Sequence, residues 1–147
     1  MPAPSFQRVV VPVAGPTDAK ATAAALAPYV DDANNTVIAV HVIEKAGGAP
    51  DKASVEQREE YAEEIFAVLT EGFADIAAAI DTQIHYGTDI ATTIIKAAHD
   101  AEAGAIVFTP RGESRWKKLL SGDVTHKLVN NSDVPILVLP DPKLGDK

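Results

Sequence analysis

The chain of 147 residues contains no cysteine. This absence excludes disulfides, thiol nucleophiles and cysteine metal sites. Aromatic residues are also few, at 5% of the chain, so Val, Ile, Leu and Ala must fill the interior. Because 46% of the residues are nevertheless hydrophobic, the composition predicts a folded domain and not a disordered chain.

Basic residues are outnumbered, with 13 Lys and Arg against 21 Asp and Glu and a net charge of −8. Nucleic-acid binding depends on neutralising phosphates with Lys and Arg, so this balance argues against a DNA or RNA partner. No apolar run approaches the roughly 20 residues of a membrane helix. The N-terminal stretch is a poor signal peptide, because Pro12 interrupts a short apolar run. We therefore expect a cytoplasmic protein without membrane insertion.

Motifs of catalysis and metal binding are missing as well. The chain has no Walker sequence, no G-x-G-x-x-G and no G-x-S-x-G. Its 4 histidines form no H-x-x-x-H pair, so the sequence predicts no metal site. Since no nucleophile is accompanied by a recognisable base, we expect a protein that is not an enzyme.

What the chain does contain is an alternation of β-rich runs with helical patterns. The runs predict strands at 8–13, 36–43, 84–86, 105–109 and 135–139. The helical patterns lie at about 17–30, from a capping box at Ser54 to Ile80, after a cap at Thr88 or Asp89, and from Asp123 to about Ser132. Such alternation predicts right-handed crossovers, and hence an α/β fold with a doubly wound parallel sheet flanked by helices. We see no linker, so 1–147 is expected to be one domain.

Ligands of a doubly wound sheet bind beyond the carboxyl ends of the strands, where the strand order reverses. If the first strand is central, the loops that follow the first and fourth strands face each other at that point. These loops are residues 14–18 and 109–124, and the second contains Gly112 and Gly122 on either side of a basic stretch. The sequence therefore predicts a small-ligand site between the two loops.

Several segments of the chain, taken in order, resemble the universal stress protein family. They are VVVPVAGP, VIAVHVI, YGTDIATTIIKAA, AGAIVFTPRG, LLSGDVTHKLV and SDVPILVLP, over about residues 7–140. The resemblance implies a Rossmann-like core over these residues, with a five-stranded parallel sheet of order 3-2-1-4-5. It also implies a homodimer joined through the last strand, at Ile136, Leu137, Val138 and Leu139. A client protein, such as a membrane transporter, is a further partner that the resemblance suggests.

Many members of this family bind ATP through a signature: G-x-x-G, nine residues, then Gly followed by Ser or Thr. In this chain Gly112 and Gly122 keep the spacing. Thr109, however, stands in the place of the first glycine, and Asp123 stands in the place of the Ser or Thr. Ala14 replaces the Asp that family members carry soon after the proline of the first strand. The ATP-binding assignments of the family therefore transfer only in part.

These departures weaken a phosphate site for physical reasons. A phosphate loop turns backbone N–H groups inward, which glycine permits. Thr109 has a Cβ and is pushed toward an extended conformation by Pro110, which has no N–H of its own. Asp123 brings a carboxylate to the helix N-terminus that an anion would use. Two unit charges about 4 Å apart repel by roughly 4 kcal/mol at an effective dielectric of 20.

The sequence therefore predicts a non-catalytic, homodimeric stress or regulatory protein with weak or absent ATP binding. One alternative is an ATP- or AMP-sensing module with an altered phosphate loop that regulates a membrane transporter, and another is a slow ATP hydrolase. No cofactor is expected apart from weakly bound ATP or AMP. The residues still available to a nucleotide are Pro12, Val42, Arg111, Gly112, Gly122, Val124 and Thr125.

Overall fold

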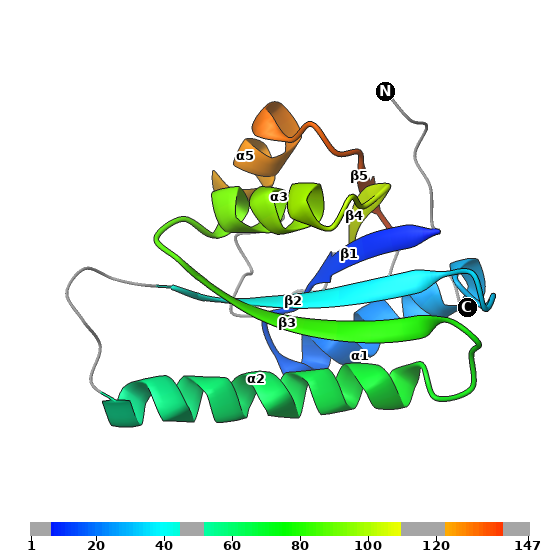
Figure 1. Cartoon of the computed structure of the whole chain (residues 1–147), viewed down its shortest axis with the longest axis horizontal. Coiled ribbons are helices and arrows are strands. Elements are labelled where there is room, and N and C mark those ends of the chain that lie inside the picture. Colours follow the sequence, from blue (N-terminus) through cyan, green and yellow to red (C-terminus); the bar gives the residue numbers. More distant parts are fainter. Residues whose placement is uncertain (1–6, 45–51, 110–122, 140–147) are drawn as a thin grey trace, which may run out of the picture.

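Five strands form one parallel sheet in the computed structural model, which describes residues 7–44, 52–109 and 123–139 (Figure 1). The strands are β1 (Arg8–Pro12), β2 (Thr36–Glu44), β3 (Ala79–Gly87), β4 (Ala105–Phe108) and β5 (Ile136–Val138). The helices are α1 (Pro16–Leu26), α2 (Lys52–Gly72), α3 (Ile90–Asp100) and α5 (Asp123–Asn131), with a 3-10 turn at Ala27–Tyr29. The strand order is β3-β2-β1-β4-β5, which confirms the predicted order.

The central strand is β1, which pairs with β2 on one side and with β4 on the other. Its residues from Val9 to Pro12 are all buried, as expected for an apolar strand that is covered on both faces. Because side chains alternate along a strand, β1 contributes to two separate cores. Val9, Val11 and Val13 lie in one of them, and Val10 lies in the other.

Each core is closed by a pair of helices. In Figure 1, α1 and α2 lie on one side of the sheet, and α3 and α5 lie on the other. On the first side, Leu26 of α1 and Ile65 and Leu69 of α2 are fully buried. On the second side, Ile94 of α3 and Leu128 of α5 are fully buried. The helices and the sheet thus form three layers, typical of a doubly wound fold.

The second helix and the third strand differ from the sequence prediction. The predicted helix ran from Ser54 to Ile80, whereas α2 begins at Lys52 and ends at Gly72, and β3 already begins at Ala79. Ser54 therefore lies inside the helix and is not its N-cap. The predicted helix was too long because Ile80, which belongs to β3, continues the helical spacing of the apolar residues of α2. As an edge strand, β3 has no fully buried residue, and it lacks the apolar run by which a buried strand is found.

Two helix ends agree with their sequence signals. Pro28 has no N–H to continue a helix, and α1 accordingly ends at Leu26 and gives way to the 3-10 turn. Asp89, one of the two residues that the sequence offered as a cap, is the N-cap of α3, and its side chain accepts a hydrogen bond from the Thr92 N–H.

Candidate functional site

The ladder between β1 and β4 ends before the ladder between β1 and β2. Within the described residues, the last pair of β1 with β4 is Val10 with Ile106. The pairing of β1 with β2 continues to Pro12 and Val40. The sheet is therefore unpaired between β1 and β4 at their carboxyl ends. This is the point where the strand order reverses and where ligands bind in this class of fold.

The missing N–H of Pro12 explains why the ladder stops. Successive residues of a strand direct their backbone groups toward opposite neighbours. The N–H of Val13 donates to the Val40 carbonyl of β2 at 2.9 Å, so Pro12 faces β4. The next bond of the ladder would run from residue 12 to the Val107 carbonyl. Proline has no N–H, and this bond cannot form.

The next backbone N–H on the β4 side of the chain is that of Ala14, and it bonds to a carboxylate and not to β4. The Ala14 N–H donates to Oδ2 of Asp18 at 3.0 Å. Asp18 lies in the first turn of α1 and is only 8% exposed. Burial raises the pKa of this carboxyl to about 6, and the hydrogen bond from Ala14 opposes the rise. The site therefore contains a buried acid that titrates slightly below neutral pH.

Two buried hydroxyl groups lie on the same side of the sheet as α1. Thr22 follows Asp18 by one helical turn and so shares its side of α1. Thr109 follows β4 and, by alternation, shares the face of Val107, which packs in the core under α1 and α2. Among the described residues, neither Thr22 Oγ1 nor Thr109 Oγ1 has a hydrogen-bond partner. Unsatisfied buried hydroxyls are rare in folded proteins.

The loop between β1 and α1 is fixed from the opposite side by two aromatic residues. His41 is buried in β2, and its Nδ1–H donates to the Val13 carbonyl at 2.7 Å. Tyr61 of α2 meets the His41 ring edge-on, with 6.3 Å between the ring centroids. A Cβ added to Gly15 would lie 3.3 Å from the Tyr61 hydroxyl, so this loop approaches α2 closely.

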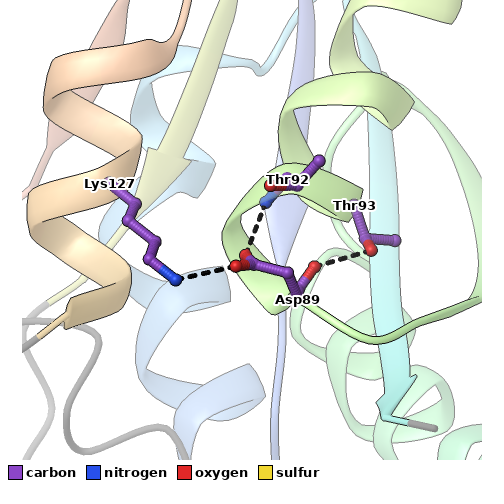
Figure 2. Close-up of polar contacts among 4 residues, drawn as sticks. All are labelled: Asp89, Thr92, Thr93 and Lys127. Atoms are coloured by element: carbon purple, nitrogen blue, oxygen red, sulfur yellow. Dashed lines mark hydrogen bonds and ion pairs between the residues drawn. The ribbon is translucent and has the colours of Figure 1, made fainter.

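On the other face of the sheet, an ion pair joins the N-cap of α3 to the middle of α5. Figure 2 shows Asp89 between Thr92, Thr93 and Lys127. Lys127 Nζ lies 2.7 Å from Asp89 Oδ2, and the Thr92 N–H lies 3.1 Å from Oδ1. The hydrogen bond from Lys127, followed by that from Thr92, lowers the pKa of Asp89. Thr93 Oγ1 donates to the Asp89 carbonyl at 2.8 Å and completes the start of the helix.

The structure describes only some of the residues that the sequence assigned to a nucleotide. Pro12 ends β1 at the opening, whereas Val42 is buried in the core under α3 and α5, on the other face from Thr22. Asp123 is the first residue of α5, as predicted. The remaining assignments lie outside the described part of the chain: Arg111, Gly112, Gly122 and the side chains of Val124 and Thr125.

Sequence reasoning missed Asp18 and Thr22 as members of a site. The available signal was their four-residue spacing, which places two polar side chains on one side of the Ala-rich helix PTDAKATAAAL. This spacing was overlooked because an Asp near a helix N-terminus is common on a protein surface, where its charge interacts favourably with the helix dipole. Only the fold shows that this one is buried.

The described part of the chain offers neither a metal site nor a membrane span. There, no group of three or more His, Asp or Glu side chains is placed to hold a metal ion. Of the helices described, none combines the length and the apolar composition that crossing a membrane requires.

Solved universal stress proteins have the same fold. The protein from Archaeoglobus fulgidus aligns with a TM-score of 0.66 and 18% identity, over 95% of this chain and 99% of that one. The A. fulgidus protein in complex with dAMP gives 0.63 and 15%, over 90% and 96%. A universal stress protein in complex with cAMP gives 0.62 and 16%, over 93% and 98%.

Sequence comparison extends this likeness beyond the fold. Among curated proteins, none is significantly similar in sequence. The model of the Universal stress protein family, however, matches residues 5–140. That range contains every strand and helix described above. The chain therefore belongs to the universal stress protein family.

Proposed function

We propose that this chain is a non-catalytic regulatory protein whose phosphate-binding site is weakened, so that ATP binds poorly or not at all. The observation that carries the proposal is the start of α5 at Asp123. An acid in the first turn of a helix interacts favourably with the free N–H groups and the helix dipole. An anionic ligand would use the same groups, so the carboxylate competes with it.

The end of β4 supports the same conclusion. Thr109 is 2% exposed, so its side chain is enclosed by the protein. The next residue, Pro110, has no N–H to offer to a phosphate. The non-catalytic part of the proposal rests on the sequence, which has no cysteine nucleophile and no motif that pairs a nucleophile with a base.

Calorimetry with ATP and Mg²⁺ tests the proposal. We expect the native chain to bind with a dissociation constant weaker than about 100 μM, that is, with less than about 5.5 kcal/mol of binding free energy. Asp123→Ser keeps a capping side chain without the charge and should tighten binding at least about tenfold. Asp75→Ser, which removes an exposed acid between α2 and β3, should leave the affinity unchanged. Low-micromolar binding by the native chain contradicts the proposal.

A second candidate function is the sensing of nucleotides with a single phosphate. It is favoured by the two universal stress proteins that were solved with dAMP and with cAMP. A ligand with one phosphate carries less negative charge than ATP and is repelled less by an acid at the start of α5. Titration with AMP beside ATP separates the two functions, because a sensor of this kind should bind AMP more tightly than ATP.

We further propose that the chain forms a homodimer through β5. This strand is at the edge of the sheet, and its segment from Pro135 to Leu139 carries no charge. An edge strand presents unpaired backbone groups to which another chain can pair, and charges on the strand are one of the devices that discourage such pairing. Val138 is 51% exposed and offers the apolar contact, whereas Ile136 and Leu137 are half-buried and Leu139 is buried within the chain.

A regulatory protein of this kind acts through a client. The client class that the family resemblance suggests is a membrane transporter, which the chain would contact from the cytoplasm. Affinity capture tests this part of the proposal: the immobilised chain is the bait, and a detergent-solubilised membrane fraction is applied to it with and without adenine nucleotide. Capture of soluble proteins alone contradicts a transporter client.

A further inference from the structure

The edge strand β3 is long and regular, and it lacks most of the features that discourage pairing with another chain. It has 9 residues, and each of them pairs with β2, so no bulge interrupts the strand. Figure 1 shows the two strands side by side. The strand contains no proline, and Asp81 is its only Asp, Glu, Lys or Arg. Among the described residues, no strand pairs with the outer side of β3, which leaves this side open to another chain.

The outer side of β3 presents the backbone groups of every second residue. The Ala79 N–H donates to the Asn35 carbonyl, next to β2, at 3.0 Å, so Ala79 faces β2. Since successive residues face opposite neighbours, the outward-facing residues are Ile80, Thr82, Ile84 and Tyr86. The Thr82 N–H donates to Oδ1 of Asp81 at 3.0 Å and not to β2, which agrees with this direction.

The side chains of β3 are polar on one face of the sheet and mainly apolar on the other. Asp81, Gln83 and His85 share a face and form a row. Gln83 Nε2 lies 3.5 Å from Asp81 Oδ2, and His85 Nε2 lies 2.8 Å from Gln83 Oε1. Ile80 and Ile84 lie on the opposite face and pack against the core under α1 and α2. The polar row therefore has an acid at one end, a histidine at the other and Gln83 at its centre.

A second copy of β3 in the antiparallel direction matches this row. If the strand overlaps its copy completely, Ala79 lies opposite Gly87, and the two-fold axis passes through Gln83. Asp81 of each copy then lies opposite His85 of the other. Both residues direct their backbone groups toward β2, so they form a non-hydrogen-bonded pair, in which the Cα atoms are only about 4.5 Å apart. A carboxylate and an imidazole at this separation are a favourable cross-strand pair.

The outward-facing residues also match in this register. Thr82 lies opposite Ile84, Ile80 lies opposite Tyr86, and each pair exchanges two backbone hydrogen bonds. The Thr82 N–H, which Asp81 covers in the single chain, then donates to the Ile84 carbonyl of the second copy. Pairs of β-branched residues with each other or with aromatic residues are favourable in sheets.

Other registers lose the acid–histidine pair. With the axis at Thr82, Asp81 lies opposite Gln83, and with the axis at Ile84 it lies opposite Gly87. With the axis at Asp81, two carboxylates lie opposite each other and repel. The register of complete overlap is therefore also the one that the charges favour.

We propose that the outer edge of β3 pairs antiparallel with β3 of a second copy of this chain, about a two-fold axis through Gln83. The contact is separate from the dimer proposed at β5, because the two strands are at opposite edges of the sheet. It is also the weaker of the two, since its polar row buries little apolar area and the copies carry a net charge of −8 each. We expect a dissociation constant of about 100 μM to 1 mM, typical of a small transient contact.

Cysteine cross-linking tests the register, because the chain has no cysteine of its own. Gln83→Cys places a thiol opposite the same thiol of the second copy, with Cα atoms about 4.5 Å apart, and a disulfide spans about 4.4–6.8 Å. Ala79→Cys is the matched control on the same face of the strand, but its two copies are about 26 Å apart in this register. We expect Gln83→Cys to form covalent dimers at least about tenfold faster, as measured on non-reducing gels.

An exchange of charges tests the pair of Asp81 with His85. His85→Asp places carboxylates opposite each other, and the double variant Asp81→Lys with His85→Lys places ammonium groups opposite each other. Each variant alone should be monomeric, whereas an equal mixture should associate, because every carboxylate then lies opposite an ammonium group. The measurement is sedimentation equilibrium in about 0.15 M salt, where the Debye length is about 8 Å.

Two further variants make the result specific to β3. All chains in the charge exchange also carry Val138→Lys, which removes the contact proposed at β5. Asp100→Lys changes an exposed charge at the end of α3 and should leave association through β3 unchanged. Thermal unfolding curves check that each variant is folded.

Three outcomes overturn the inference: equal cross-linking of Gln83→Cys and Ala79→Cys, a mixture that associates no more than its components, or a Val138→Lys chain that stays monomeric at about 1 mM. Failure of the β5 dimer has a different signature. In that case Val138→Lys does not change the mass of the native chain, and Gln83→Cys still cross-links rapidly.

Discussion

Lys127 of α5 forms an ion pair with Asp89 of α3, with 2.7 Å between Nζ and Oδ2. The side chains are 49% and 34% exposed, and pairs that are open to solvent contribute little stability. The same carboxylate also caps α3 through the Thr92 N–H, and a cap of this kind is usually worth about 1 kcal/mol. The two roles of Asp89 should therefore differ in energy.

The first prediction separates these roles. Asp89→Ala removes both the cap and the ion pair, and we expect it to lower the free energy of unfolding by about 1–2 kcal/mol. Asp89→Asn retains a capping oxygen and should cost about 0.5 kcal/mol or less. Denaturant unfolding near neutral pH measures both. A loss as large for Asn as for Ala would show that the ion pair with Lys127 is the dominant contribution.

The second prediction concerns the pH dependence caused by Asp18. Its pKa is raised from 3.8 to about 6 in the folded chain, so the folded state binds this proton more tightly than the unfolded state. The difference destabilises the fold as pH rises from about 4 to about 6, by up to about 3 kcal/mol. Asp18→Asn should therefore stabilise the chain above pH 6 and lose this advantage near pH 4.

Unfolding curves at several pH values measure that effect as the difference between native chain and variant. Asp75→Asn changes an exposed acid and should show little pH dependence. A constant difference between Asp18→Asn and the native chain from pH 4 to pH 7 contradicts the raised pKa.

The third prediction concerns the unpartnered hydroxyls. Thr22→Val and Thr109→Val replace a buried group without a described hydrogen bond by an apolar one of the same shape. We expect each to raise the free energy of unfolding of the ligand-free chain by about 1 kcal/mol. Thr93→Val is the matched control, because it removes a hydroxyl that donates to the Asp89 carbonyl, and it should be destabilising. Destabilisation by all three variants would show that Thr22 and Thr109 do have partners.

The fourth prediction tests the close approach of α1 and α2. A Cβ at Gly72 would lie 2.6 Å from the Cβ of Ala23. Helix propensity alone favours Ala over Gly by about 1 kcal/mol. The overlap opposes this gain, and we expect Gly72→Ala to lower the free energy of unfolding by about 1–3 kcal/mol. The double variant Gly72→Ala with Ala23→Gly should recover part of the loss, and stabilisation by Gly72→Ala alone would contradict the close packing.

The fifth prediction tests the proposed dimer. Val138→Lys puts a charge on the exposed side of β5 and should shift the chain toward monomer, as measured by light scattering at tens of micromolar. Val129→Lys is the control, since Val129 is 62% exposed on α5 and outside the edge strand. A native chain that is monomeric under the same conditions contradicts the homodimer.

The order of the strands could be predicted because segments of the chain resemble a family whose sheet has that order. The alternation of strands and helices by itself predicts only a doubly wound parallel sheet. The buried strand at Val9–Val11 is a continuous apolar run, and the cap at Asp89 is a single residue with a known preference. The start of β3 could not be predicted, since a strand at the edge of the sheet needs no apolar run. Ile80 fitted a helix and a strand equally well.

The buried acid beside the end of β1 could not be predicted from the sequence, for a different reason. The burial of Asp18 depends on tertiary contacts, and its hydrogen bond to Ala14 follows from the loss of a β4 partner next to Pro12. Each of these residues is unremarkable in the sequence. Their relation appears only when the direction of each backbone N–H is known, which requires the register of β1 with both neighbours.

The missing N–H of Pro12 affects how the carboxyl end of the sheet, between β1 and β4, can change over evolution. Because residue 12 donates no hydrogen bond to β4, a ligand that binds beside it breaks no strand hydrogen bond at this position. Side chains near this end of the sheet can then be exchanged without changing how the strands pair. A chain with this proline could lose its affinity for phosphate and acquire another ligand while its sheet stayed as it was.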